Sequence, residues 1–424
     1  MKGRLIAGLD IGSSAIRMAV GQISATQDRQ SHLSLIGAAE VKSQGITKAA
    51  ISSFEDAVSA ISACLDQAEG MVGLPIEDLY VSVGGSQITV TDAKGIIGVS
   101  RSDQTIRRED VVRALEAART YANTPNYDII HVLPLRFSVD NQKDIKDPLG
   151  MQGIRLEAEV KVIQGLSNHL RNITKAVFRT NVDIDELVYA PLAAAEAVTN
   201  KRQKELGVCV ISMGASTTGV AVYENGELVH ANTFLMGSDH ITSDLVYTLR
   251  TSFEVAEQLK RARGSAAPES FQKHDQIDLK DFGAETSEAV QLPFVAEVIE
   301  ARVEEIFEKV ESELKRIDRS GLLPAGMVLT GGGAKLPGIT EVARRIFHLP
   351  AVVGASQAES SVPELVQDTQ FSTAVGLVQW GYEAERQADG AGGRGALGRT
   401  ARQAGDVFSK ISDPIKKIFK SFMP

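Results

Sequence analysis

The same short pattern occurs twice in the sequence, once near the beginning and once near the middle. The two copies are residues 5–23 (LIAGLDIGSSAIRMAVGQI) and 208–226 (VCVISMGASTTGVAVYENG). Each predicts a strand, a turn of small residues and a second strand. When Asp10 is placed over Ser212, Gly12 aligns with Gly214. Because short identities also arise by chance, the repeat fits either two related half-domains or two unrelated hairpins.

Both turns have the composition of a phosphate-binding loop. Backbone N–H groups of a Gly12-Ser13-Ser14 turn can point at phosphate oxygens, and Asp10 at the strand end can hold a hydrated Mg²⁺. A plain Asp-Gly-Ser turn is the alternative for one hairpin alone. The second turn offers the same small residues and hydroxyls, namely Gly214, Ala215, Ser216, Thr217 and Thr218. Together the two turns predict a triphosphate site that closes from opposite sides.

A third glycine-rich segment lies near residue 330. Residues 328–335 (VLTGGGAK) predict a strand that runs into Gly331, Gly332 and Gly333, with Lys335 two positions further on. Glycines at such a place let a ligand approach the backbone. A simple helix-entry loop is the alternative.

Composition limits the remaining possibilities. A chain of 424 residues suggests two or three domains. The net charge of -9 gives no overall attraction for nucleic acid. Cys64 and Cys209 lie in apolar stretches, which predicts two buried thiols in a reducing compartment. We expect no signal peptide and no membrane-spanning segment, because no apolar run approaches about 20 residues. No metal-ligand spacing or catalytic histidine set is evident.

Helical periodicity returns in several segments between and after the hairpins. We expect helices within 104–122, 243–263 and 293–317, and short strands in 126–163 that belong to a small α+β insertion. Val303, Ile306, Phe307, Val310, Leu314 and Ile317 form one apolar face, for which core packing is the simplest role. A glycine-rich tether is expected over 384–405, so the folded part should end near Tyr382.

The last 20 residues predict an amphipathic helix. Its apolar stripe consists of Phe408, Ile411, Ile415, Ile418, Phe419 and Phe422, and its basic residues include Lys416, Lys417 and Lys420. Packing on the protein's own core is the usual role of such a helix, but the tether argues against it. We therefore expect the helix to lie in the headgroup layer of an anionic membrane without crossing it.

Taken in order, the three loops resemble those of the actin, Hsp70 and sugar-kinase superfamily. AGLDIGSSAIR is similar to its first phosphate loop, ISMGASTTGVAV to its second and VLTGGGAKLPGI to its adenosine loop. Glu257 and Lys260 resemble the E-x-x-K helix that reaches the ribose and adenine, with a solvated ion pair as the alternative. The resemblance implies an α/β actin-like fold of two related ribonuclease-H-like half-domains, with ATP and Mg²⁺ as cofactors.

Within this superfamily, residues 1–382 most resemble the FtsA family of bacterial cell-division proteins. Residues 145–156 (IKDPLGMQGIRL) resemble its inserted subdomain and 299–305 (IEARVEE) a helix of its upper subdomain. The resemblance implies peripheral attachment to the cytoplasmic side of the inner membrane at the division site, filament formation, and binding of the FtsZ C-terminal peptide and other division proteins. Arg302 is the expected FtsZ contact; a solvated arginine is the alternative.

The resemblance also implies a division into domains. The expected boundaries are 1–84 and 164–206 for the first actin-like domain (1A), 85–163 for the inserted subdomain (1C), 207–236 and 320–382 for the second actin-like domain (2A), 237–319 for the upper subdomain (2B), 383–405 for the linker and 406–424 for the membrane helix.

Two positions depart from the superfamily pattern. Ser212 stands where an Asp usually helps to hold Mg²⁺, and Ala190 stands before Pro191, where a Glu or Gln usually orients the attacking water. We therefore name no catalytic residue and expect ATP binding with slow or absent hydrolysis. The alternatives are a sugar-kinase-like phosphotransferase, which would need a carboxylate base, and a pilus-assembly or plasmid-partition relative of the same fold.

Overall fold

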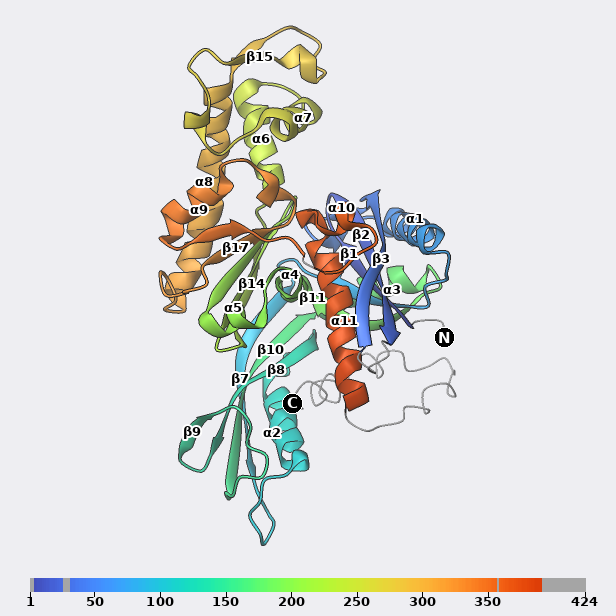
Figure 1. Cartoon of the computed structure of the whole chain (residues 1–424), viewed down its shortest axis with the longest axis vertical. Helices are drawn as coiled ribbons and strands as arrows, with labels where there is room; N and C mark the ends of the chain where they lie inside the picture. The colour runs from blue at the N-terminus through green and yellow to red at the C-terminus, as the bar shows by residue number, and fades with distance from the viewer. Residues whose placement is uncertain (1–3, 26–30, 357, 391–424) are drawn as a thin grey trace.

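The computed structural model describes residues 4–25, 31–356 and 358–390, and it contains two five-stranded mixed sheets (Figure 1). The first sheet has the order β11-β6-β1-β2-β3. Its strands are β1 (Arg4–Ile11), β2 (Ala15–Ala25), β3 (Ser31–Lys42), β6 (Asp78–Val83) and β11 (Asp183–Tyr189). β1, β2 and β3 pair antiparallel, whereas β1, β6 and β11 pair parallel.

The second sheet repeats this arrangement strand for strand. Its order is β14-β13-β12-β17-β18, and its directions match those of the first sheet. The strands are β12 (Val208–Met213), β13 (Thr218–Glu224), β14 (Glu227–Phe234), β17 (Met327–Thr330) and β18 (Ala351–Val353). Asp10 pairs with Arg17 in the first hairpin, and Ser212 pairs with Gly219 in the second. The prediction of two related halves is thus confirmed.

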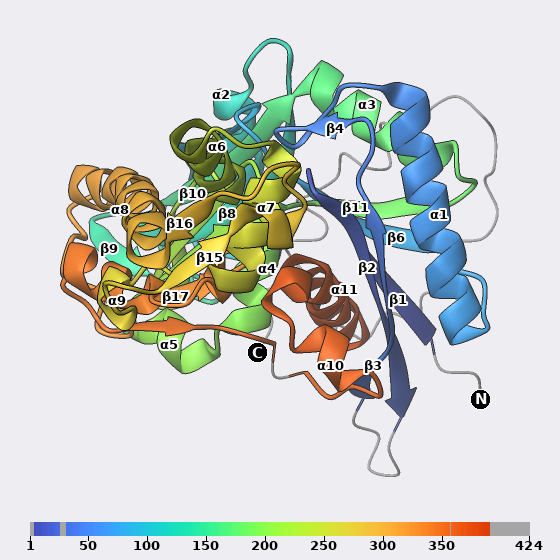
Figure 2. The same cartoon turned by 90° about the horizontal axis from the view of Figure 1, so that it is seen from above.

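Helices cover the first sheet on both faces (Figure 2). α1 (Phe54–Val72) and α3 (Ser167–Phe178) lie on the outer face, and α4 (Ala190–Val198) and α11 (Ser372–Gly390) lie between the two sheets. A Cβ atom at Gly376 of α11 would lie 1.7 Å from the carbonyl oxygen of Ala193 in α4, so a glycine is needed where the two helices cross. Cys64 and Cys209 are buried free thiols, as predicted, and burial raises the pKa of Cys64 to about 12.

A third sheet is inserted between β6 and β11 and extends from one end of the molecule (Figure 1). Its antiparallel order is β7-β10-β8-β9, from β7 (Ile88–Gly98), β8 (Tyr127–Val139), β9 (Gln142–Ile145) and β10 (Arg155–Leu166). α2 (Arg108–Ala122) packs on this sheet through Ala114, Leu115 and Ala118, which are fully buried or nearly so. The predicted α+β character of this insertion is confirmed.

The opposite end of the molecule is mainly helical. It holds α6 (Ser238–Leu249), α7 (Phe253–Arg263), η1 (Pro268–Ser270), β15 (Gln276–Asp278), η2 (Leu279–Phe282), β16 (Ala289–Gln291) and α8 (Leu292–Arg316). The single helical segment expected over 243–263 is two helices, because Arg250 takes a left-handed conformation (φ 51°) and Ser252 caps a new start. The apolar face of α8 is buried as predicted, with Ile317 partly buried beyond its end.

The remaining elements are short. They are β4 (Ile46–Thr47), β5 (Ala50–Ile51), α5 (Lys201–Leu206), η3 (Gly332–Lys335), α9 (Ile339–Phe347), α10 (Pro363–Val366) and η4 (Thr369–Phe371). In the part of the chain that the structure describes, no helix is both long and apolar enough to cross a bilayer.

The last described helix is longer than expected. The sequence predicts that the folded part ends near Tyr382 and that the linker starts at 383, but α11 continues to Gly390. Two ion pairs support the added turns: Glu385 pairs with Arg4 of β1 at 2.8 Å, and Arg386 pairs with Glu383 at 3.2 Å. The predicted membrane residues, 408–422, lie outside the described residues.

Candidate functional site

The first turn joins β1 to β2, and the predicted carboxylate, Asp10, lies near the end of β1 just before it. Asp10 Oδ1 accepts a hydrogen bond of 2.7 Å from Ser82 Oγ, and Ser82 Oγ accepts one of 3.1 Å from the backbone N–H of Ile11. Ser82 lies on β6, which pairs parallel with β1, so the two strand ends meet. Gly12 is required because a Cβ atom there would lie 2.6 Å from the carbonyl oxygen of Ala15. Sheet pairing thus fixes the Asp10 carboxyl group.

The second turn, Gly214–Thr217, is closed by its own backbone and fixed from behind. The N–H of Gly214 donates to the carbonyl of Thr217 at 2.8 Å. Two N–H groups at the start of α6 donate to the same turn: Ser238 to the Gly214 carbonyl (2.9 Å) and Asp239 to the Ala215 carbonyl (2.8 Å). The turn is therefore hydrogen-bonded to α6, which belongs to the helical end of the molecule (residues 238–316), called the upper helical region below.

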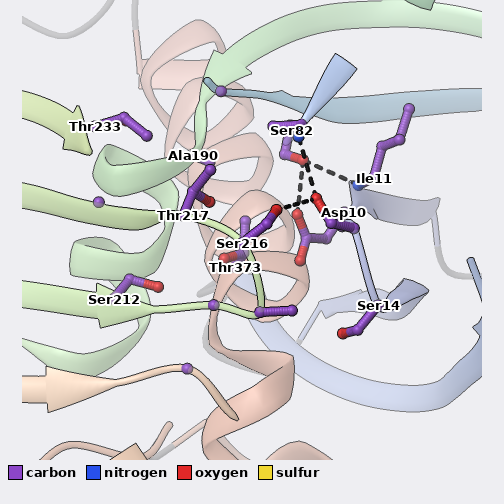
Figure 3. A pocket seen from close by; sticks show the side chains of 18 of the residues that line it. Asp10, Ile11, Ser14, Ser82, Ala190, Ser212, Ser216, Thr217, Thr233 and Thr373 are labelled. Atoms are coloured by element: carbon purple, nitrogen blue, oxygen red, sulfur yellow. Dashed lines mark hydrogen bonds between the residues drawn. The ribbon is translucent and has the colours of Figure 1, made fainter. Parts of the chain in front are cut away.

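The two turns meet at a pair of serine hydroxyls. Ser216 Oγ donates to Ser13 Oγ at 2.7 Å, and Ser13 Oγ also accepts the backbone N–H of Ala49 at 3.1 Å. Figure 3 shows Asp10, Ser82 and Ser14 on one side of a pocket and Ser212, Thr217 and Ala190 on the other. The pocket is lined by Asp10, Ile11, Gly12, Ser13, Ser14, Arg17, Ala49, Ser82, Gly84, Gly85, Ala190, Pro191, Ser212, Gly214, Ala215, Ser216, Thr217, Gly219, Thr233, Gly331, Gly332, Gln370 and Thr373.

The third glycine segment closes the pocket next to the second turn. Gly331 has φ 83°, and a Cβ atom on it would lie 2.6 Å from the carbonyl oxygen of Met213. Its N–H donates to the Thr369 carbonyl (3.1 Å) and its carbonyl accepts from Thr369 Oγ1 (2.9 Å). A Cβ on Gly333 would lie 2.4 Å from Met213 Sδ. These two glycines are therefore needed for packing against Met213 as well as for any ligand approach.

The carboxyl group of Asp10 carries the main electrostatic perturbation of the pocket. Burial raises its pKa, although the hydrogen bond from Ser82 and the nearby charge of Arg17 oppose the rise. Among the described residues that line the pocket, Asp10 is the only carboxylate. Ser212 occupies the equivalent place in the second hairpin. Ala190, the first residue of α4, presents only a methyl group.

Several predicted nucleotide residues do not line this pocket. Lys260 Nζ donates to the Ser238 carbonyl (3.0 Å) and to Thr242 Oγ1 (2.7 Å), and Glu257 Oε2 accepts from Thr242 Oγ1 (2.6 Å). This Glu257–Lys260 pair lies behind the second turn, because Ser238 also contacts Gly214. Three further predicted residues are engaged elsewhere: Gly333 packs on Met213, Thr218 Oγ1 donates to the Met236 carbonyl and Lys335 pairs with Asp368.

Arg302 lies far from the pocket, on α8. Its guanidinium donates twice to the Asp244 carboxylate and pairs with Glu305, which raises the pKa of Arg302. The structure thus places Arg302 inside an ion-pair network on the upper helical region. Within the described ranges, no cluster of three His, Cys, Asp or Glu side chains could hold a metal ion.

Five further residues line the pocket and were not predicted from the sequence, namely Arg17, Ser82, Thr233, Gln370 and Thr373. Arg17 had a local signal, because a turn at residues 12–14 pairs positions 10 and 17 across the hairpin. Ser82 and Gln370 reach the pocket only through long-range pairing of β6 and through η4, and no local pattern marks them.

The fold and the paired hairpins define an actin-like protein with an inserted subdomain. Among solved structures, a PilM-PilN type IV pilus biogenesis complex matches at 14% identity with a TM-score of 0.63, covering 89% of this chain and 98% of that one. MreB5 of Spiroplasma citri bound to ADP matches at 11% identity with a TM-score of 0.53, covering 91% and 98%. At these identities the likeness concerns the fold alone.

Sequence relatives identify the family within this class. The family models "Cell division protein FtsA" and "SHS2 domain inserted in FTSA" match residues 209–376 and 85–164. FtsA of Pseudomonas aeruginosa is 32% identical, covering 92% of this chain and 91% of the relative, and FtsA of Bacillus subtilis is 35% identical, covering 89% and 83%. The chain belongs to the FtsA family of cell division proteins.

Proposed function

We propose that this division protein binds ATP with Mg²⁺ in the pocket between its two turns and hydrolyses it slowly or not at all. The observation that carries the proposal is the meeting of the turns at Ser13 and Ser216, beside the Asp10 carboxylate. Backbone N–H groups of such turns can donate hydrogen bonds to phosphate oxygens. One buried carboxylate can accept a hydrogen bond from a water molecule that is bound to Mg²⁺. The solved structures of Spiroplasma citri MreB5 bound to ADP and to AMPPNP support a nucleotide in this fold.

Slow hydrolysis follows from what the pocket lacks. Groups that orient and activate the attacking water are worth a factor of about 10² to 10⁴ in rate. Ser212 and Ala190 line the pocket at the two places where such groups are expected, and neither is ionisable or able to orient water as a carboxylate does. We infer that nucleotide acts as a structural ligand that holds the two halves together.

This part of the proposal is tested with purified protein. Titration with Mg·ATP should give saturable binding, while phosphate release in the same sample stays near the rate of a protein-free control. Failure to bind ATP would contradict the nucleotide site, and brisk Mg²⁺-dependent phosphate release would contradict the structural role.

We further propose that the upper subdomain, 237–319, receives the C-terminal peptide of FtsZ near Arg302. The support is family membership together with the position of Arg302, whose carboxylate partner Asp244 could be exchanged for an acidic group of the peptide. Arg302→Gln should weaken binding of a labelled FtsZ peptide. Arg316→Gln is the matched control, since Arg316 lies on the same helix and pairs with Glu313. Equal binding by both variants would exclude Arg302 as a contact.

The third part concerns residues 406–424, which we propose as the attachment to the anionic cytoplasmic face of the inner membrane at the division site. Burying two Phe and two Ile side chains completely would contribute on the order of 6 to 12 kcal/mol, and less at interfacial depth. One such helix binds reversibly, whereas subunits joined in a filament bind by avidity. Membrane attachment and self-association would then reinforce each other and link the FtsZ ring to the membrane.

A further inference from the structure

A row of three charged residues crosses the first sheet at the pocket. The strand registers pair Asp10 of β1 with Arg17 of β2, and Arg17 with Glu40 of β3. Directly opposite residues of antiparallel strands have Cβ atoms about 4.5–5.5 Å apart on the same face. A guanidinium group therefore stands between two carboxylates, one of which belongs to the pocket.

Arg17 is held in a fixed position. Its side chain is 10% exposed; Nε donates to Glu40 Oε2 at 2.7 Å and Nη2 donates to Gln370 Oε1 at 2.6 Å. The guanidinium carbon also lies 5.8 Å from the centre of the Phe371 ring. These contacts come from β3 and η4, so the cation is oriented before any ligand arrives.

Arg17 and Asp10 are the only charged residues among the described residues that line the pocket. Glu40 does not line it, and its side chain is 45% exposed to solvent, which screens its charge. The pocket wall thus carries one positive and one negative charge.

The second hairpin shows that this charge pair is not required by the repeated fold. The positions equivalent to Asp10 and Arg17 are Ser212 and Gly219. A Cβ atom on Gly219 would lie 2.8 Å from the Pro191 ring, so no long side chain fits there. A phosphate chain in this pocket would therefore meet one guanidinium and one carboxylate. A wall with two carboxylates would instead need a divalent cation before it could accept phosphates.

We propose that Arg17 is a phosphate-positioning residue whose fixed guanidinium lets the pocket bind nucleoside di- and triphosphates without a divalent cation. The inference rests on the proposed nucleotide-binding function. It adds which residue binds the phosphates and that this binding does not require Mg²⁺. Adenosine, which has no phosphate, gains nothing from Arg17.

The test is equilibrium binding of ATP, ADP and adenosine, each measured in Mg²⁺ and in EDTA. The wild type should change its ATP affinity by less than about tenfold between the two buffers. Arg17→Gln should weaken ATP and ADP in EDTA by about 10- to 100-fold, the usual range for a hydrogen bond to a charged group. Mg²⁺ should restore part of this loss, and adenosine affinity should not change.

Two other variants separate a direct role from a structural one. Arg136→Gln removes the same charge from an exposed pair with Asp144, remote from the pocket, and should bind like the wild type. Glu40→Gln keeps an acceptor oxygen for Arg17 Nε but removes the competing negative charge, so phosphate binding in EDTA should hold or tighten. If Arg17 only supported the fold, Glu40→Gln would lose affinity as Arg17→Gln does, and adenosine would be affected too.

The outcomes are distinguishable. A wild type that binds no ATP even with Mg²⁺ overturns the proposed function, whereas one that binds ATP only with Mg²⁺ overturns the role of Arg17 alone. If Arg17→Gln does not fold, Arg17→Lys is measured in its place. Lysine keeps the positive charge but cannot contact Glu40 and Gln370 as the guanidinium group does. An ATP affinity in EDTA that lies between that of the wild type and that of a site that requires Mg²⁺ supports the proposal. If every variant, including those at Arg17, binds ATP in EDTA as tightly as the wild type does, the proposal is overturned.

Discussion

Ser216 Oγ donates a hydrogen bond of 2.7 Å to Ser13 Oγ, although the two residues are 203 positions apart in the sequence. The bond joins the turns of the two related hairpins at the mouth of the same pocket. Each turn is independently fixed, the first through Ser82 and Asp10 and the second through the start of α6. The two halves of the molecule are thus in register at their equivalent turns.

The coupling between these hydroxyls is measurable. Ser13→Ala and Ser216→Ala should each lower the free energy of unfolding by about 0.5–1.5 kcal/mol, the net worth of a neutral hydrogen bond. Ser13→Ala should cost more, because Ser13 Oγ also accepts the N–H of Ala49. In a double-mutant cycle followed by urea denaturation, the two effects should not add. Strict additivity would show that the bond contributes nothing to stability.

Asp10→Asn should stabilise the nucleotide-free protein at neutral pH. Burial raises the pKa of Asp10 above its ordinary 3.8, against the opposing effects of Ser82 and Arg17. A raised folded-state pKa means that the folded protein retains a proton that the unfolded chain releases. Stability therefore falls as the pH rises from 3.8 through the folded pKa, and Asn removes this loss.

The measurement is the free energy of unfolding of both proteins across that pH range. Asn keeps an acceptor for Ser82, so the hydrogen bond survives. Asp66→Asn, at an exposed position of α1, is the matched control that removes one carboxyl group outside the pocket. If the stability of Asp10→Asn changes with pH as that of the wild type does, the pKa of Asp10 is not raised in the folded protein.

Gly331→Ala should destabilise the protein while Gly332→Ala should not. Alanine at Gly331 must adopt φ 83° and bring its Cβ within 2.6 Å of the Met213 carbonyl oxygen, which costs at least about 1–3 kcal/mol. At Gly332 the closest atom is Gln370 Cγ at 3.5 Å, an ordinary contact. Chemical denaturation of the two variants gives the difference, and equal stabilities would mean that the loop shifts freely.

Restoring the two missing polar groups should raise hydrolysis. Ser212→Asp combined with Ala190→Gln places a second carboxylate and an amide on the pocket wall. Phosphate release should rise towards the factor of about 10² to 10⁴ that such groups supply. ATP binding by the double variant is measured in parallel. Retained binding without faster release would show that other features of the pocket limit the rate.

Removal of residues 407–424 should release the protein from anionic liposomes while leaving ATP affinity unchanged. The deleted segment holds the apolar stripe and the lysines, and it lies beyond α11 and the pocket. Vesicle sedimentation measures the first effect and nucleotide titration the second. Unchanged sedimentation would refute the role of the tail.

The repeated hairpins were predictable because alternation of apolar residues and a turn of small residues are local properties of the sequence. The same local properties predict Asp10 and both turns. They also place Arg17 opposite Asp10 in the first hairpin, although Arg17 was not among the predicted site residues. Ser82 and Gln370 were not predictable, since only the parallel pairing of β6 with β1 and the path of η4 bring them to the pocket. The extent of α11 was misjudged because an ion pair between Arg4 and Glu385 joins opposite ends of the described chain.

The route of the chain into α11 also has a mechanical consequence. Residues after Gly390 are connected to the folded body through this helix, whose Ala374, Val375 and Leu377 are fully buried. At its start, η4 binds Gly331 through Thr369 and Arg17 through Gln370. Tension applied at Gly390 would therefore pass along α11 to η4, whose Thr369 and Gln370 contact two residues of the pocket.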